Sequence, residues 1–303
     1  TIAQLAELLR RQGWHPAWTS LVAVRAGGSR APIFLVSPFP ITTLSFAHLA
    51  RHLGPEQPVY ALQPQGMEGE HAVHDRVEDM AAHYIREIQS VQPEGPYALV
   101  GHCAGSWVAF EMAVQLQRQG ERVCPLVVVD SEPPGVDPPP TSLISRAANR
   151  LRHYWQLGRL REAVHWKMKV LTERSLRTRL GTTETRRVAG LRKTHSEAHR
   201  RYRPTSRARG NAMLIRSAES SRLRDKDWHR LWSERITGEL IVEIVPSTHA
   251  GLVDDASSEA LAVKIRQAMQ EHVGPAPRRK GFGPGGVEGS PRRTGRSLPP
   301  SGG

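Results

Sequence analysis

Short apolar runs and segments of helical periodicity alternate along most of the chain. The apolar runs predict strands at 21–25, 32–37, 58–62, 97–101, 123–130, 212–216 and 240–245. Apolar residues at helical spacing predict helices at 44–53, 77–91, 104–119, 221–232 and 257–272. This repeated alternation with short connections favours right-handed crossovers and a mainly parallel sheet covered by helices on both faces.

One long block interrupts the alternation. Prolines and a glycine between Ser131 and Pro140 predict a loop, and residues 143–203 then show only helical patterning with no strand candidate. The strand and helix pattern resumes at residue 212. A helical block inserted into an α/β sheet is the layout of a hydrolase core with a lid, so we expect an α/β-hydrolase fold with an inserted all-helical lid.

These patterns divide the chain into four parts. Residues 16–140 and 211–272 are expected to form the α/β core, and residues 141–210 the lid. The N-terminal residues present one apolar helical face, so we expect 1–15 to be the closing helix of a preceding domain with a linker. Residues 273–303 are rich in Gly, Pro, Ser and Arg and are expected to form a disordered tail, because their few apolar side chains cannot offset chain entropy.

The positive charge of the chain is concentrated in the lid. The 303 residues have a formal net charge of +13, and residues 141–210 hold 19 Lys and Arg against 4 Asp and Glu. Because the positive charge is confined in this way, the chain is not expected to have the uniformly basic surface of a protein that coats nucleic acid. Lid residues such as Arg146 and Arg150 would attract an anionic substrate or an acidic carrier surface, and a solvated helical face is the alternative explanation.

Several classes of protein are excluded by composition. Apolar runs such as 31–39 are too short to cross a bilayer, so we expect no membrane partner. The two cysteines, Cys103 and Cys124, exclude a disulfide scaffold and a cysteine-rich zinc site, and they fit a reducing compartment. We therefore expect a cytoplasmic protein without a metal site.

The strongest candidate for chemistry is Cys103. The segment Y-A-L-V-G-H-C-A-G-S combines an apolar strand, a tight turn that holds the thiol, and a helix, which is the nucleophile elbow with cysteine where serine is usual. Gly101 and Gly105 fit this turn because it brings the backbone close to neighbouring elements. The positive end of the following helix favours a thiolate. The alternative is a small buried hydrophobe, which is the interpretation for Cys124.

Two further residues complete a triad in the order nucleophile, acid, base. Asp130 ends the strand after the nucleophile helix, at the carboxyl edge of the sheet, and His249 follows the last strand. Cys103 would attack, His249 would move the proton, and Asp130 would hold the imidazole in the useful tautomer. Asp130 has the alternative role of a cap or turn residue, and its rival as the acid is Glu219.

The oxyanion formed during acyl transfer needs two hydrogen-bond donors. The backbone N–H of Ala104, directly after the nucleophile, is one candidate. The second should come from the loop after strand 32–37, where Pro38 and Pro40 have no N–H, so Phe39 is the best donor.

Together these residues resemble a known family, the terminal (type I) thioesterase domains of nonribosomal peptide and polyketide synthases. The resemblance is closest over 32–130 and looser over 202–251. Besides the elbow, its marks are V-Y-A-L-Q at 59–63, V-E-D-M-A-A at 77–82, Q-P-E-G-P-Y at 92–97 and L-V-V-V-D-S at 126–131. It implies that a peptide arrives on the phosphopantetheine arm of an upstream carrier domain in the same polypeptide, that it passes to the nucleophile, and that no cofactor is bound directly.

The chain departs from this family in its nucleophile, in its basic lid, and in having Ser37, Pro40 and Ile41 where histidine and glycines are common. A cysteine keeps the acyl group at the energy of a thioester, which suits a poor internal nucleophile or a strained product. Family members with cysteine here include ones implicated in forming β-lactones and β-lactams. The resemblance therefore implies ring closure, with a β-lactam antibiotic of the monobactam kind as the product to test first.

Other functions remain open at this stage. Hydrolysis would release a linear peptide from the same cysteine, since water exclusion by the lid decides between the two outcomes. A stand-alone editing thioesterase or a cysteine hydrolase of the dienelactone type would use the same three residues. A catalytically inactive module with a nucleic-acid-binding insert would show salt-dependent binding and no covalent labelling.

Overall fold

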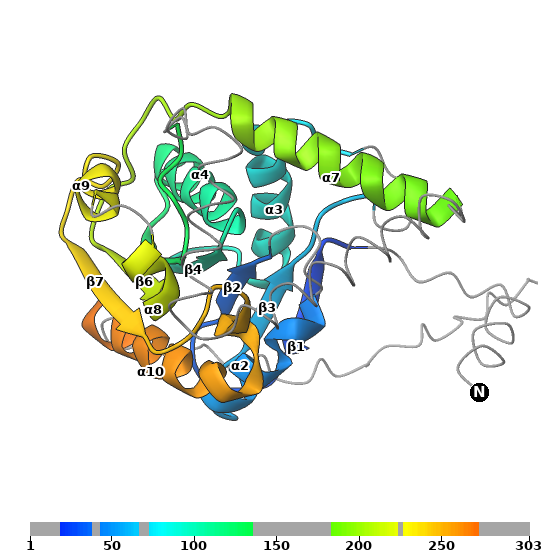
Figure 1. Ribbon diagram of the computed structural model, residues 1–303. Helices are drawn as coiled ribbons and strands as arrows, with labels where there is room; N and C mark the ends of the chain where they lie inside the picture. Colours follow the sequence, from blue (N-terminus) through cyan, green and yellow to red (C-terminus); the bar gives the residue numbers. More distant parts are fainter. Residues whose placement is uncertain (1–18, 38–42, 67–72, 136–182, 224–226, 273–303) are drawn as a thin grey trace, which may run out of the picture.

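The computed structural model describes residues 19–37, 43–66, 73–135, 183–223 and 227–272 (Figure 1). Seven strands form one sheet in the order β1-β3-β2-β4-β5-β6-β7. Strand β1 runs antiparallel to β3, and every other neighbouring pair is parallel. The strands are β1 (Leu21–Arg25), β2 (Ile33–Val36), β3 (Val59–Leu62), β4 (Tyr97–His102), β5 (Val123–Val129), β6 (Ala212–Ser217) and β7 (Leu240–Val245).

Helices cover both faces of this sheet (Figure 1). One core cluster joins the sheet to α3, α4 and α9, and a second joins it to α2 and α10. The described helices are η1 (Thr43–Phe46), α2 (Ala47–Leu53), α3 (Val77–Val91), α4 (Gly105–Arg118), α7 (Thr183–Arg201), α8 (Ala218–Leu223), α9 (Trp228–Ser233), η2 (Ala250–Val253) and α10 (Asp255–His272). None of the described helices is both long and apolar enough to cross a membrane.

Burial follows the sequence pattern. Every residue of β2 and β4 is buried, as expected for central parallel strands whose two faces are covered. The buried residues of α3 recur at helical spacing on one face of that helix, and they are Val77, Met80, Ala81, Tyr84, Ile85 and Ile88. The mainly parallel sheet with helices on both faces agrees with the expected fold.

One predicted helix is wrong. The expected helix at 221–232 is two short helices, α8 and α9, and residues 224–226 between them lie outside the described residues. Helix α8 begins directly after β6, where the Ser220 N–H donates to the Ser217 hydroxyl at 3.1 Å. A serine that accepts from the first turn in this way starts a helix early, which the apolar periodicity did not reveal.

The described part of the expected lid begins with α7. This helix packs across α3 and α4 (Figure 1), and Tyr202 just beyond it donates from its hydroxyl to Glu111 of α4 at 2.5 Å. The expected preceding helix (1–15), residues 141–182 of the expected lid and the expected tail (273–303) lie outside the described residues.

Two glycines let the β4–α4 turn form. A Cβ on Gly101 would lie 2.3 Å from the Ser106 Cα, and a Cβ on Gly105 would lie 2.3 Å from the Val36 carbonyl oxygen. Both clashes are with backbone, which cannot move aside as a flexible side chain can. The expectation that these positions need glycine because of close backbone approach is therefore confirmed.

We predict that Gly105→Ala lowers the free energy of unfolding by about 3 kcal/mol, because α4 must move away from β2. Gly190→Ala in α7 is the matched control, since a Cβ there meets nothing within 4 Å. That control should raise the free energy of unfolding by about 0.5–1 kcal/mol. Urea denaturation of both variants tests this, and equal midpoints for Gly105→Ala and the parent would contradict it.

Candidate active site

Cys103 lies in the turn between β4 and α4. Its backbone φ is +50°, a left-handed conformation that is uncommon for any residue except glycine. The Cys103 N–H donates to the Val129 carbonyl at 2.8 Å, and the Ser106 N–H donates to the Cys103 carbonyl at 3.0 Å. The side chain is half-buried, so these contacts fix the turn while the thiol stays within reach of other groups.

The structure brings Cys103, Asp130 and His249 together. Asp130 follows β5, is buried, and also has a left-handed backbone with φ +49°. His249 Nδ1 donates to Asp130 Oδ2 at 2.7 Å, and the Cys103 side chain hydrogen-bonds the same imidazole. The predicted nucleophile, base and acid thus form one continuous chain of hydrogen bonds.

Asp130 accepts hydrogen bonds from a turn that the sequence analysis missed. The Ser217 N–H donates to Oδ1 at 3.0 Å, the Ser217 hydroxyl donates to Oδ2 at 2.7 Å, and the Ser220 hydroxyl also donates to Oδ1. Burial alone would raise the pKa of Asp130, but the bonds from His249, Ser220 and Ser217 outweigh it and lower the pKa to about 2. The carboxylate is therefore charged at neutral pH.

The base is held in its protonated form. The hydrogen bonds to Asp130 and then to Cys103 raise the pKa of His249 to about 10. At neutral pH the imidazole therefore carries a proton on both ring nitrogens. Cysteine suits this arrangement, because its thiolate is the nucleophilic form.

Glu219 does not take the place of Asp130. Its carboxylate accepts a hydrogen bond from the backbone N–H of His249 at 2.8 Å, whereas the ring nitrogen is bonded to Asp130. Asp130, and not Glu219, is therefore the residue that contacts the imidazole Nδ1.

A second histidine lies against the base. His102, the last residue of β4, stacks on the His249 ring with centroids 5.7 Å apart. Burial, and then the charge of His249, lower the pKa of His102 to about 4, so it is neutral at neutral pH. Neither of its ring nitrogens has a hydrogen-bond partner within the described part of the chain.

Of the two predicted oxyanion donors, Ala104 lies within the described residues and Phe39 does not. Ala104 directly precedes α4, so its N–H belongs to the helix start, where amides have no acceptor within the helix. The Ala104 carbonyl is contacted by His199 Nε2 of α7 at 2.9 Å, which ties the lid helix to the elbow.

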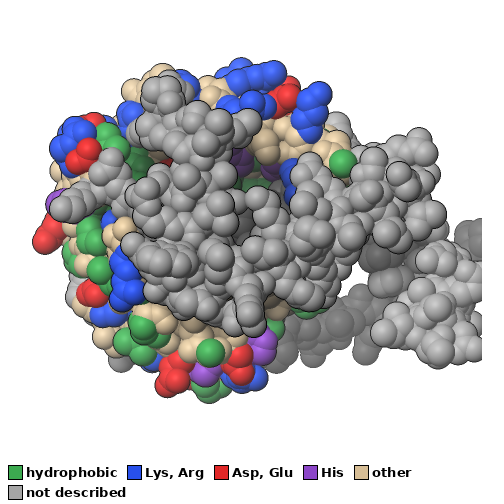
Figure 2. All heavy atoms as spheres, viewed as in Figure 1, with side chains coloured by type: hydrophobic (Ala, Val, Ile, Leu, Met, Phe, Trp, Pro, Cys, Tyr) green, Lys and Arg blue, Asp and Glu red, His purple; other side chains and the backbone are tan. Residues whose placement is uncertain are grey.

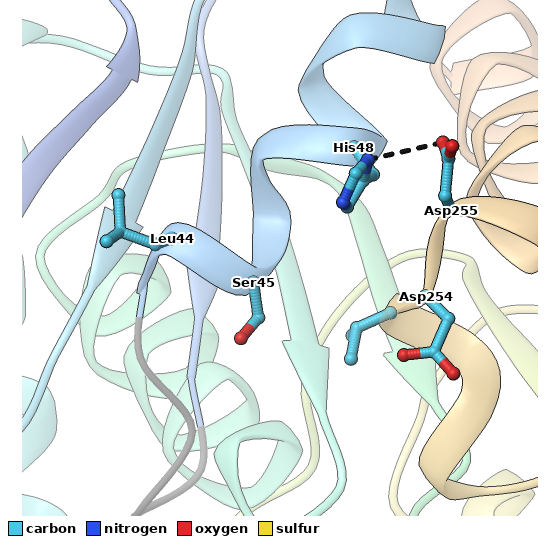
Figure 3. Close-up of a pocket in the computed structure, with 6 residues that line it drawn as sticks. Leu44, Ser45, His48, Asp254 and Asp255 are labelled. Atoms are coloured by element: carbon cyan, nitrogen blue, oxygen red, sulfur yellow. Dashed lines mark ion pairs between the residues drawn. The ribbon is translucent and has the colours of Figure 1, made fainter.

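A shallow pocket of about 390 Å³ lies between η1 and η2 (Figure 3). His48 points toward Asp255 across it, and His48 Nδ1 lies 3.2 Å from Asp255 Oδ1. None of the three predicted catalytic residues lines the pocket. Within the described ranges, no group of three or more His, Cys, Asp or Glu residues could hold a metal ion.

A mainly parallel sheet with Cys103 in the turn after β4, Asp130 after β5 and His249 after β7 has the arrangement of an α/β-hydrolase. The chain matches the thioesterase domain family over residues 31–269 and belongs to that family. The predicted fold and the predicted family are therefore confirmed.

Similar proteins include large peptide synthetases. A dimodular nonribosomal peptide synthase of Bacillus subtilis (strain 168) is 39% identical over 133 residues, which cover 44% of this chain and 6% of that protein. The chondramide synthase cmdD of Chondromyces crocatus is 39% identical over 142 residues, which cover 45% of this chain and 4% of that protein. The chain thus spans a small part of the length of these relatives.

Solved structures share the fold. A four-domain nonribosomal peptide synthetase, holo-AB3403, matches with a TM-score of 0.64 and 25% identity over 88% of this chain and 21% of that chain. The NocB thioesterase domain of the nocardicin cluster matches with a TM-score of 0.60 and 23% identity over 83% of this chain and 99% of that domain. Thioesterase domains of such synthetases act on groups carried on the phosphopantetheine of a carrier domain and have no cofactor of their own.

We predict that Ser217→Ala lowers the free energy of unfolding by about 1–3 kcal/mol at neutral pH, because a buried carboxylate loses a donor. The difference from the parent should shrink as the pH falls from 3.8 toward about 2, because the folded-state pKa of Asp130 is depressed and its stabilising effect is lost when it is protonated. Ser221→Ala, which removes a hydroxyl bonded only to the Ala218 carbonyl, is the control. Denaturation at several pH values would contradict the prediction if the two variants behaved alike.

Proposed function

We propose that this chain is the peptide-releasing thioesterase domain of a nonribosomal peptide synthetase. It accepts a peptidyl group from the phosphopantetheine thioester of an upstream carrier domain onto the Cys103 sulfur, and then releases that group. The observation that carries the proposal is the hydrogen-bonded chain from Cys103 through His249 to Asp130.

Loading begins with attack of the Cys103 thiolate on the thioester carbonyl. A carbon–sulfur bond forms, and the carbonyl oxygen becomes an oxyanion that the Ala104 N–H, and by our expectation the Phe39 N–H, stabilise. When the tetrahedral intermediate collapses, the bond to the pantetheine sulfur breaks. The departing thiolate takes the proton of His249, and Asp130 keeps the imidazole oriented through Nδ1.

Release requires a second attack on the Cys103 thioester. The neutral His249 left by loading removes a proton from the attacking group, which is either a group of the peptide itself or water. Collapse of the second intermediate breaks the bond to Cys103 and restores the thiolate beside the imidazolium. No reactant other than the peptide, or water in the hydrolytic case, is needed.

Ring closure is the release that we favour. Exchange between two thioesters is nearly even in energy, so the peptide on Cys103 stays more activated than it would on serine. This suits a weak internal nucleophile and a small strained ring, and we propose a β-lactam of the monobactam kind. A thioesterase domain of similar fold is described as cyclising the lipopeptide antibiotic surfactin, with a TM-score of 0.55 and 21% identity. Hydrolysis to a linear peptide is the alternative.

The charge of α7 supports an anionic partner. Lys and Arg side chains gather over this helix (Figure 2), and the exposed ones are Arg192, Lys193, Arg200 and Arg201. Arg200 and Arg201 lie 3.9 Å from Glu197, so this weak pairing leaves a net positive face. Such a face would attract an anionic peptide or the acidic surface of a carrier domain.

We predict that Cys103→Ala abolishes acyl loading from a synthetic peptidyl pantetheine thioester, whereas Cys103→Ser still loads but releases more slowly. An oxyester on serine is less activated than a thioester on cysteine, so the second attack, which releases the peptide, is slower. Cys124→Ala is the control, because burial raises the pKa of the Cys124 thiol and disfavours its thiolate. Intact-protein mass with peptide mapping reads the adduct, and an adduct on Cys124 alone would refute the proposal.

The product distinguishes ring closure from hydrolysis. We predict that a peptidyl pantetheine thioester with an internal nucleophile placed for a four-membered ring gives a product lighter by one water than the linear acid. A peptide without that nucleophile is the control and should remain on Cys103 or be hydrolysed. Mass spectrometry of the small molecules measures this, and the linear acid as the sole product from the first peptide would remove the cyclisation proposal.

A further inference from the structure

The loop that carries His249 is tied to the first turn of α8 by one residue. The Glu219 backbone N–H donates to the Ser247 carbonyl at 3.2 Å, and the Glu219 carboxylate accepts from the His249 backbone N–H at 2.8 Å. The two bonds lie on either side of Thr248. Glu219 therefore fixes the position and direction of the chain where the histidine leaves the sheet.

His249 needs such support because burial does not hold it in place. Its side chain is 44% exposed, and its backbone lies at the start of the short helix η2. A carboxylate that accepts from a main-chain N–H makes a charge-assisted bond, stronger than one between neutral groups. The imidazole can meet both Asp130 and Cys103 only when the backbone that bears it is correctly placed.

The same turn also holds the acid. Ser217 and Ser220, which flank Glu219, donate to Asp130. Residues 217–220, which end β6 and begin α8, therefore bind the acid through two serines and the backbone of the base through one carboxylate. Because this one turn at the end of the buried strand β6 holds both Asp130 and the main chain of His249, it sets the distance between them.

We propose that Glu219 is a positioning residue for catalysis, acting on the His249 main chain and not as an acid of the triad. This inference rests on the proposed function of the chain. The acid role is already filled, because His249 Nδ1 donates to Asp130 at 2.7 Å while the Glu219 oxygen is engaged by the main chain.

The test is the rate of alkylation of Cys103 by iodoacetamide as a function of pH, in full-length chains that carry Cys124→Ala. This rate reports the Cys103–His249 pair and needs no knowledge of the peptide substrate. Turnover of a peptidyl pantetheine thioester is measured in parallel, to separate kcat from KM. Thermal unfolding of each variant shows whether any loss comes from a smaller folded fraction.

Glu219→Ala should lower kcat by about tenfold to a hundredfold with KM little changed. It should also make the alkylation rate of Cys103 depend less on His249, so that its pH profile differs from that of the parent. Glu219→Gln keeps an oxygen acceptor for the His249 N–H, so it should retain most of the parent rate. Asp130→Asn should remain strongly impaired. Glu239→Ala is the control for loss of a carboxylate, because Glu239 is exposed and precedes β7 at the opposite edge of the sheet.

Two results would overturn the inference. Glu219→Ala with the alkylation profile and kcat of the parent would show that the bond does not position the base. If Glu219→Gln lowered kcat as much as Asp130→Asn does, the negative charge of Glu219 would be essential, which would indicate an acid role. If Glu219→Ala does not fold, Glu219→Met, which keeps the side-chain length without an oxygen, replaces it. Failure of the parent to load Cys103 would refute the proposed function but would leave the alkylation comparison intact.

Discussion

The absence of a side chain at Gly105 is the constraint on which the site depends. The Val36 carbonyl occupies the space that a Cβ at this position would need. This contact lets α4 begin directly against the end of β2, so the helix start and the Cys103 turn lie beside the end of that strand. Acyl transfer needs a nucleophile and N–H donors around one carbonyl group, and the close approach at Gly105 places Cys103 and the start of α4 beside the end of β2.

The charges of Asp130 and His249 depend on groups at the ends of neighbouring strands. Parallel strands β4, β5, β6 and β7 all end at one edge of the sheet, and each end contributes a residue to the site. The carboxylate of Asp130 is stabilised by donors from the end of β6, and it in turn keeps the imidazole of His249 protonated. Neutral His102 beneath that imidazole adds no competing positive charge. The protonation of His249 is thus set by groups at the ends of these strands.

Much of this arrangement was predictable because it depends on local patterns and chain order. The apolar runs of β2 and β4 and the amphipathic face of α3 have clear periods, and the elbow motif fixes Cys103. Ser217 and Ser220 could not be found, because serine beside a strand has many local roles. Glu219 was considered only as an acid, since sequence does not tell whether a carboxylate meets a ring or a main-chain N–H. The same serine turn explains why α8 begins before the predicted helix.

The left-handed backbone of Cys103 has an evolutionary consequence. A non-glycine residue in this conformation costs roughly 1–3 kcal/mol, which the surrounding contacts must offset. Glycine at that position would relieve the strain while removing the sulfur. Replacement by glycine would therefore stabilise the fold while it inactivates the site, so only selection for turnover keeps a side chain with a sulfur in this turn.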